Sequence, residues 1–339
     1  MNFYKKLRRK PKQFLTFTGM SLERFEELLP EFEAADRAVE AERKRVVVRT
    51  GAARKRKPGG GGKYQNDLAN RLLMTLLYLR LYCSQEFISL LFRSSDGSVV
   101  SRTIKATLPV LERVLPVPER ERKRILSLAK EVNKQRKRRI GTIEEFLEAY
   151  PELDFILDVV EQGKRKPRKK EKRKSDYSGK KCKHTNKQAV MTTSSGLIVH
   201  QSRSIGGRPH DFALFKQDLA ENKQLYYNEL GIENGIRATL YGDSGFQGLE
   251  DLGLPCEARL IQRAKRNHPL TLEEKKINKL RAGKRIKIEH SFAQRKKYRI
   301  ASDIYRNDDQ YYDQYMNVVS GLVNLRIKEH IYQKTGIYA

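Results

Sequence analysis

Three acidic residues stand where divalent-cation chemistry would need them. Asp158 ends the apolar run 155–157, and Asp243 follows a second apolar run, 238–241. Glu289 lies in a strongly basic segment with helical spacing. An acid at the tip of a buried strand is held rigidly, and converging carboxylates bind hard cations such as Mg²⁺. A pair of such ions stabilises the attacking and leaving oxygens of a phosphoryl displacement, so the pattern predicts that chemistry.

The identity of the second acid is open between Asp243 and Asp211. Asp243 comes before a Ser-Gly pair, the tight exit expected beside a metal site. Asp211 follows His210 at a predicted helix start, where a carboxylate is a good N-terminal cap. We favour Asp243 and interpret Asp211 as a cap or a support for the site. Glu161, three residues beyond Asp158, is interpreted as supporting or structural.

Two cations share the helical face of the third acid. Offsets of four and seven residues put Arg285, Glu289 and Lys296 on one side of a helix. Glu289 would then bind metal, while the cations would hold phosphates or balance developing charge. Spacing alone is more typical of a solvent-facing row of ion pairs. Together with Asp158 and Asp243, it favours the site.

The strongly positive charge of the chain favours polyanions as binding partners. The formal net charge is +29 and the isoelectric point is about 10.0, so the protein attracts polyanions with strong salt dependence. The alternative is a basic protein that functions in association with RNA or ribosomes. The sequence shows no signal peptide and no apolar run long enough to span a bilayer, which predicts a cytoplasmic protein without a membrane partner. Three scattered cysteines without a CxxC pair predict reduced thiols.

The first half of the chain has helical periodicity. Helices are predicted over 21–34, with Ser21 as cap, and over 66–82. A short segment at 84–92, a turn at 94–97 and a helix capped by Ser98 match a helix-turn-helix. An ordinary three-helix unit has the same shape, and the charge favours DNA binding. The predicted DNA contacts of the second helix are Ser101, Arg102 and Lys105.

From about residue 150 the pattern becomes α/β. Strands are predicted at 153–160, 186–194, 197–204 and 237–242, and helices at 210–222, 271–296 and 309–332. Three strands, a helix, a further strand and then helices is the order of an RNase H-like core. The basic run 164–174 is predicted to be a solvated loop that also suits a DNA backbone.

Composition and the order of the predicted elements divide the chain into six expected regions. They are an N-terminal helical and basic region (1–57), a Gly-rich linker (58–65), a helix-turn-helix region (66–118), a basic connecting helix (119–149), an α/β domain with RNase H-like element order that carries the three acids and is expected to be catalytic (150–305), and a C-terminal helix expected to pack on it (306–339).

Several short motifs follow one another in a set order. They are Tyr177-Ser178-Gly179-Lys180-Lys181-Cys182-Lys183-His184-Thr185, Gly207-Arg208-Pro209-His210-Asp211, Gly242-Asp243-Ser244-Gly245-Phe246-Gln247-Gly248, and the spacing Arg285-x3-Glu289-x6-Lys296. With the strand around Asp158 and the helix-turn-helix, they resemble bacterial insertion-sequence transposases of the DDE endonuclease type, related to the Harbinger-like group. Val160 and Ala282 depart from the related motifs, where Thr and Tyr are common.

The resemblance implies an α/β RNase H-like catalytic domain preceded by an all-α helix-turn-helix region. It implies that Asp158, Asp243 and Glu289 hold two Mg²⁺ (or Mn²⁺) ions for cleavage at terminal inverted repeats and strand transfer into target DNA. A homodimer or larger synaptic complex, associated with a bacterial nucleoid, follows from the same resemblance. The DNA contacts expected in this region are Tyr177, Lys180, Lys181, Lys183, His184, Arg285 and Lys296.

Two other functions fit the same residues. A domesticated, catalytically inactive DNA-binding protein would keep the helix-turn-helix and the charge. A general metal-dependent nuclease of the same fold would cut without recognising particular ends.

Overall fold

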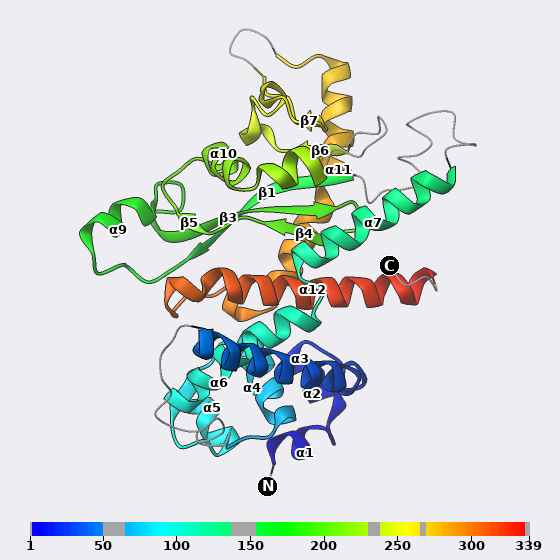
Figure 1. The fold of residues 1–339 in the computed structure, drawn as a ribbon. Helices are drawn as coiled ribbons and strands as arrows, with labels where there is room; N and C mark the ends of the chain where they lie inside the picture. Colours follow the sequence, from blue (N-terminus) through cyan, green and yellow to red (C-terminus); the bar gives the residue numbers. More distant parts are fainter. Residues whose placement is uncertain (1, 50–64, 137–153, 230–237, 265–268, 336–339) are drawn as a thin grey trace. The chain divides into compact units, whose positions relative to one another are not determined.

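The computed structural model describes residues 2–49, 65–136, 154–229, 238–264 and 269–335 (Figure 1). The chain forms two compact units. The first contains Met1–Leu115 with Lys296–Asp303 and Gln314–Val319. The second contains Pro116–Arg295 with Ile304–Asp313 and Ser320–Ala339. Most of the predicted Gly-rich linker and the last part of the predicted connecting helix lie outside the described residues.

The first unit is helical. Its helices are α1 (Phe3–Leu7), α2 (Pro11–Thr18), α3 (Leu22–Arg49), α4 (Leu68–Leu81), α5 (Gln85–Phe92) and α6 (Gly97–Val114). Helix α4 is central, because every residue from Asn70 to Leu79 is buried. Helices α5 and α6 form the predicted helix-turn-helix, and α6 turns a strongly apolar side toward the core through Val100, Ile104 and Leu108.

Side-chain caps define the ends of these helices. Ser21 Oγ accepts a hydrogen bond from Arg24 N at 3.2 Å, as predicted for the start of α3. The predicted cap of α6 is wrong. The cap is Asp96, whose carboxylate accepts from the backbone N–H groups of Ser98 and Val99. A carboxylate bonds two free amides at once, whereas a hydroxyl at Ser98 would sit inside the first turn.

The second unit contains a mixed sheet. Its strands are β1 (Asp154–Gly163), β2 (Tyr177–Ser178), β3 (Lys183–Thr193), β4 (Ile198–Gln201), β5 (Ile205–Gly206), β6 (Thr239–Gly242) and β7 (Glu257–Leu260). The path through the sheet is β2-β3-β1-β6-β7, and β4 and β5 also pair with β3. Strand β1 is antiparallel to β3 and parallel to β6, and β6 is parallel to β7. The predicted strands are confirmed as β1, β3, β4 and β6, while β7 was not predicted.

Helices cover both faces of this sheet (Figure 1). The helices are α7 (Pro118–Arg136), α10 (Asp211–Glu221), α11 (Leu272–Lys296) and α12 (Tyr312–Thr335). On one face Phe155 and Leu157 pack into a core with Leu214 and Phe215 of α10, and α7 adds to the same core. On the other face Ile156 packs with Ile288 of α11. Successive residues of β1 therefore serve two separate layers.

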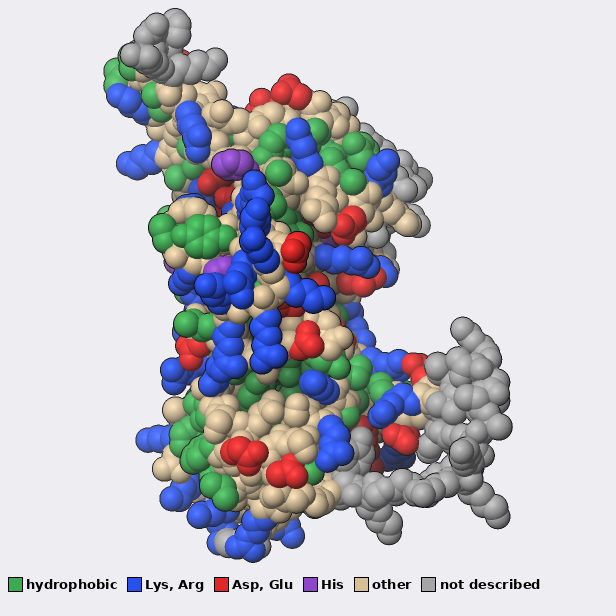
Figure 2. Space-filling view, turned by 90° about the vertical axis from the view of Figure 1, so that its left-hand side faces the viewer, with side chains coloured by type: hydrophobic (Ala, Val, Ile, Leu, Met, Phe, Trp, Pro, Cys, Tyr) green, Lys and Arg blue, Asp and Glu red, His purple; other side chains and the backbone are tan. Residues whose placement is uncertain are grey.

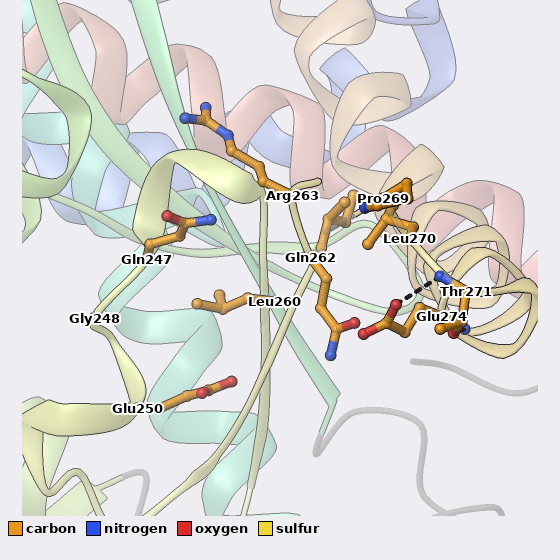
Figure 3. Close-up of a pocket in the computed structure, with 11 residues that line it drawn as sticks. Gln247, Gly248, Glu250, Leu260, Gln262, Arg263, Pro269, Leu270, Thr271 and Glu274 are labelled. Carbon is orange, nitrogen blue, oxygen red and sulfur yellow. Dashed lines mark hydrogen bonds between the residues drawn. The ribbon is translucent and has the colours of Figure 1, made fainter. Parts of the chain in front are cut away.

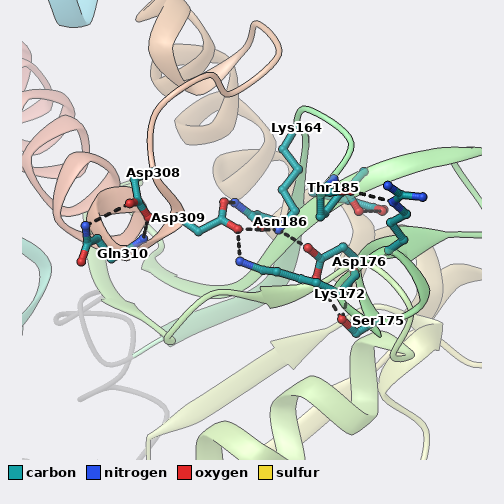
Figure 4. Close-up of polar contacts among 12 residues, drawn as sticks. Lys164, Lys172, Ser175, Asp176, Thr185, Asn186, Asp308, Asp309 and Gln310 are labelled. Atoms are coloured by element: carbon teal, nitrogen blue, oxygen red, sulfur yellow. Dashed lines mark hydrogen bonds and ion pairs between the residues drawn. The ribbon is translucent and has the colours of Figure 1, made fainter. Parts of the chain in front are cut away.

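The basic run 164–174 is not a loop throughout, because α9 (Lys170–Asp176) begins within it. Buried Lys164 anchors this segment: its Nζ lies 2.6 Å from Asp176 Oδ2 and 3.0 Å from Asp309 Oδ2. Lys172 Nζ also reaches Asp309 Oδ2 at 2.5 Å (Figure 4). Burial would raise the pKa of Asp309, but hydrogen bonds from Lys172 and Lys164 lower it overall. Ion pairing thus orders a segment whose composition alone indicates solvation.

No helix in the described parts of the chain combines the length and the apolar character needed to cross a membrane.

Candidate active site

Asp158 and Asp243 lie side by side on one face of the sheet. The parallel pairing of β1 and β6 runs from Asp154 opposite Thr239 to Ile156 opposite Tyr241. Continuing this register by two residues brings Asp158 opposite Asp243. Side chains two residues apart share a face, so both carboxylates lie on the face of Ile156. Their proximity is also electrostatic, because the charge of Asp243 contributes to raising the pKa of Asp158.

The carboxylate of Asp158 is held from two sides. Oδ1 accepts a hydrogen bond from Val159 N at 2.8 Å, and Oδ2 accepts from Arg285 Nη2 at 3.0 Å. Burial is the largest influence and raises the pKa of Asp158 above its ordinary value. The Arg285 charge and the Val159 amide act in the opposite direction without cancelling it. Asp158 therefore carries its negative charge at a cost that a nearby cation would relieve.

Asp243 occupies the tight exit that the sequence indicates. It caps the short 3₁₀ turn Ser244–Phe246, and its Oδ1 accepts from Gly245 N at 2.7 Å. A Cβ at Gly245 would lie 2.8 Å from that oxygen, so the absence of a side chain permits the close approach. The cap fixes the direction of the Asp243 carboxylate immediately after a fully buried strand.

Glu289 is positioned by α11 but stands apart from the two aspartates. Its neighbour Ile288 packs against Ile156 and Tyr241, which docks this part of α11 on the face of Asp158 and Asp243. The Glu289 side chain is exposed and makes no hydrogen bond or ion pair with a described residue. Within the described residues, no three His, Cys, Asp or Glu side chains gather into a metal-binding group. The structure thus joins two of the three predicted acids.

The donor chemistry of the aspartate pair fits a hard divalent cation. Carboxylate oxygens are the ligands that Mg²⁺ and Mn²⁺ prefer. Asp158 is partly buried beside a second carboxylate, and its pKa is raised for both reasons. A cation between the two groups would offset that repulsion. Arg285 supplies part of the compensating charge in this structure.

Glu161 and Asp211 belong to the opposite face of the sheet. Glu161 pairs in register with Lys187, and its Oε1 accepts from Thr185 Oγ1 at 2.7 Å. Lys187 Nζ lies 3.1 Å from Asp211 Oδ1. The cap position of α10 is His210, and Asp211 is its first helical residue. Both acids are thus bound into contacts on the α10 side, away from Asp158.

The predicted DNA contacts of the Tyr177 motif lie on a hairpin. Strands β2 and β3 pair Tyr177 with His184, whose rings meet edge to face at 5.6 Å. The tip of the hairpin is exposed, as is the Tyr177 ring. Lys and Arg dominate the charged side chains on the face that includes α9 (Figure 2). The exposed cations of the hairpin are Lys180, Lys181 and Lys183.

The remaining predicted contacts lie in the first unit. On α6, Arg102 is exposed, while Ser101 and Lys105 are half-buried. Lys296 is the last residue of α11 and is exposed, and it groups with the first unit.

A pocket of about 630 Å³ lies beyond the carboxyl end of β7 (Figure 3). Its lining includes Leu260, Gln247 and Gln262. Its far wall is the start of α11, where Glu274 Oε2 accepts from Thr271 N and Thr271 Oγ1 accepts from Glu274 N. This capping box is a sequence signal for the helix start predicted at residue 271, whereas β7 on the other side of the pocket was not predicted.

Comparison with known families agrees with this architecture. Residues 157–324 match the family described as DDE superfamily endonuclease. Residues 67–116 match the family described as helix-turn-helix of DDE superfamily endonuclease, which spans α4 to α6. No curated protein and no solved structure matches the chain.

Proposed function

Because the chain belongs to the DDE superfamily of endonucleases and carries that superfamily's helix-turn-helix, we propose that it is a DNA transposase. In this proposal it cuts DNA at the ends of a mobile element and transfers the freed 3′ ends to target DNA. The observation that carries the proposal is the placement of Asp158, on β1, beside Asp243, which directly follows the adjacent parallel strand β6.

Asp158, Asp243 and Glu289 would hold two divalent cations, Mg²⁺ or Mn²⁺. When bound, such ions supply an activated water and neutralise charge on the scissile phosphate. Strands β1 and β6 would fix the two aspartates, and the Ile288 contact would keep α11 on the same face. Glu289 would complete the set by a rotation of its exposed side chain or a small shift of α11.

Arg285 would position both an acid and the substrate. Its guanidinium already donates to Asp158, and five N–H donors leave others for a phosphate oxygen. Asp211 and Glu161 would act as supports of the fold on the opposite face. The hairpin from Tyr177 to His184, with Lys180, Lys181 and Lys183, and the end of α11 at Lys296 would contact DNA backbone.

The helix-turn-helix would recognise terminal inverted repeats through α6. Recognition helices of this motif place side chains near their N-terminal end against base edges, which fits Ser101, Arg102 and Lys105. Two ends must be held together for strand transfer, so the active form would be a homodimer or larger complex. Its place in a bacterial cell would be the cytoplasm, on the nucleoid. The Harbinger-like affiliation remains a prediction.

The test is cleavage of a labelled duplex that carries the sequences flanking the gene, with Mg²⁺ or with EDTA, by wild type and Asp158→Asn. Metal-dependent nicking at the element's boundary, absent in the variant, is the expected result. Binding without cutting by wild type would favour a catalytically inactive DNA-binding protein. Cutting at random positions would favour a general nuclease.

A second pair of variants tests the choice of acid. Asp243→Ala should abolish cleavage, whereas Asp211→Ala should only weaken the contact with Lys187. Cleavage that survives in Asp243→Ala and fails in a folded Asp211→Ala variant would reverse the assignment.

A further inference from the structure

A second pocket, of about 460 Å³, lies between α11, α12 and the turn that joins β3 to β4, within the second unit. The ionisable side chains that line it are all Lys, Arg or His. The side chains that give it this character are Lys287, His290, Arg326, His330 and Lys334. No Asp or Glu is among the described residues that line it.

None of these five side chains makes a hydrogen bond or ion pair with a described residue, so the charges of Lys287, Arg326 and Lys334 have no acidic partner in the described part of the chain. Some other cations of the second unit are paired with acids. Lys284 pairs with Asp154 at 3.0 Å, and Lys164 pairs with Asp176. Grouping unpaired cations in a concave site concentrates positive potential there. The pocket is thus prepared for an anion from outside the chain.

Buried contacts hold the walls of this pocket in place. Ser291 Oγ of α11 donates to Gly196 O in the β3–β4 turn at 2.6 Å. Gly196 has φ +91°, and a Cβ there would lie 3.1 Å from Ser291 Oγ. On the other wall, Asn324 of α12 bonds both the backbone N–H and the carbonyl of Ile198. The cations therefore project from a fixed frame.

The pocket is separate from the aspartate pair. With about 100° per residue, Lys287 and His290 lie about 140–200° round α11 from Arg285. The buried residues Ile288 and Ser291 pass between the two flanks. The β3–β4 turn also lies at the amino end of β1, where Ser194 N donates to Asp154 O. Asp158 is four residues further along, or about 13 Å at about 3.3 Å per residue.

We propose that this pocket binds a backbone phosphate of the DNA on which the enzyme acts. Amines, a guanidinium and imidazole N–H groups are donors that suit phosphate oxygens, and charge-assisted bonds of this kind are strong. Contacts to phosphate fix the position of a duplex without reading its sequence. The pocket would thus anchor DNA at a point remote from the cleaved bond. This inference rests on the proposed function for its choice of DNA.

The test is the salt dependence of duplex binding by the variant Lys287→Gln/Arg326→Gln/Lys334→Gln. The matched control, Lys12→Gln/Lys216→Gln/Lys223→Gln, removes the same charge from exposed sites elsewhere. The plot of log binding constant against log salt should become shallower by about 0.9 for each phosphate that the protein no longer neutralises. We expect a change of about that size in the pocket variant and little change in the control. Equal slopes in the two variants would overturn the proposal.

Two further measurements separate the possible failures. Urea unfolding should give the pocket variant the wild-type midpoint, because its substituted side chains bond no described residue in the folded protein. The control variant should lose at most the contact of Lys216 Nζ with the Phe212 ring, 4.6 Å from its centroid. Isothermal titration with inorganic pyrophosphate tests whether the pocket binds a free anion instead. If wild type binds pyrophosphate, the pocket variant does not, and the salt slope of DNA binding is the same in both, the assignment to DNA is overturned.

Cleavage of end DNA by wild type reports the proposed function separately. If wild type cleaves end DNA but the pocket and control variants have equal salt slopes, only the phosphate-binding proposal is wrong. If the salt slope changes in the pocket variant alone and wild type does not cleave end DNA, the phosphate-binding proposal is supported and the proposed function is wrong.

Discussion

Arg285 of α11 donates a hydrogen bond to Asp158 of β1 across 3.0 Å, at a point where both side chains are largely shielded from solvent. The pair links the helix that carries Glu289 to the strand that carries the first aspartate. Burial nevertheless keeps the pKa of Asp158 above its ordinary value. Ionised Asp158 therefore lowers the stability of the folded protein at neutral pH.

Asp158→Asn should therefore stabilise the metal-free protein near neutral pH while abolishing cleavage. The folded-state pKa of Asp158 is raised above 3.8, so the stability that goes with the protonated form is present below pH 3.8 and is lost as pH rises through the raised pKa. Asparagine does not ionise, so the variant keeps this stability at neutral pH. Urea unfolding in EDTA should show the variant's gain at pH 7 and little difference at pH 3. A variant less stable than wild type at pH 7 would mean that the Arg285 ion pair outweighs burial.

Lys164→Met should lower the free energy of unfolding by about 3–5 kcal/mol, because it strands the buried Asp176 carboxylate. Lys172→Met is the control, since the Lys172 side chain is 47% exposed and its pairing with Asp309 should contribute at most about 1 kcal/mol. Adding Asp176→Leu to Lys164→Met should recover part of the loss. Equal effects of the two single variants in urea unfolding would contradict this view of the cluster.

Gly283→Ala should raise the free energy of unfolding by about 0.5–1 kcal/mol, since Gly283 lies within α11 and a Cβ there would meet nothing within 4 Å. Gly196→Ala should act in the opposite direction and cost about 1–2 kcal/mol, because its φ is +91°. Thermal or urea unfolding of both variants checks the pair. Destabilisation by Gly283→Ala would show that α11 needs flexibility at this point.

Arg102→Ala should weaken binding to the element's ends without lowering stability, because Arg102 is exposed on α6. The expected loss is about 1–3 kcal/mol if it contacts a base, or a salt slope shallower by about one if it contacts a phosphate. Ile104→Ala is the contrasting variant: Ile104 is fully buried, so its truncation should cost about 2–5 kcal/mol of folding free energy. Unchanged binding in Arg102→Ala would remove α6 as the recognition helix.

Local patterns predicted the elements well where periodicity was strong. The helix-turn-helix and the long strands β1 and β3 follow from apolar spacing that burial later satisfied. Strand β7 escaped prediction because Glu257–Leu260 is four residues long and only Leu260 is buried. Helix α9 escaped because its composition indicates solvation, while its order depends on Lys164 and Asp309, residues far apart in sequence.

The candidate site was only partly predictable. Asp158 and Asp243 could be named from the strands before them, but their adjacency depends on the register of β1 against β6, which is a tertiary property. Likewise, the spacing of Asp158 and Glu161 puts them on opposite faces of a strand, but which of the two shares a face with Asp243 and which faces α10 depends on the tertiary fold. Whether Glu289 joins the aspartates stays a prediction.

Strand β1 is paired on both sides, with β3 along most of its length and with β6 at its start. Adding or deleting one residue between Asp154 and Asp158 would turn Asp158 into the apolar layer beneath α10 and break both pairings together. An insertion or deletion here would therefore disrupt the sheet itself, so its main effect would be on folding. The position of Asp158 is thus fixed by the same strand pairings that form the sheet, so it can change only if the fold changes with it.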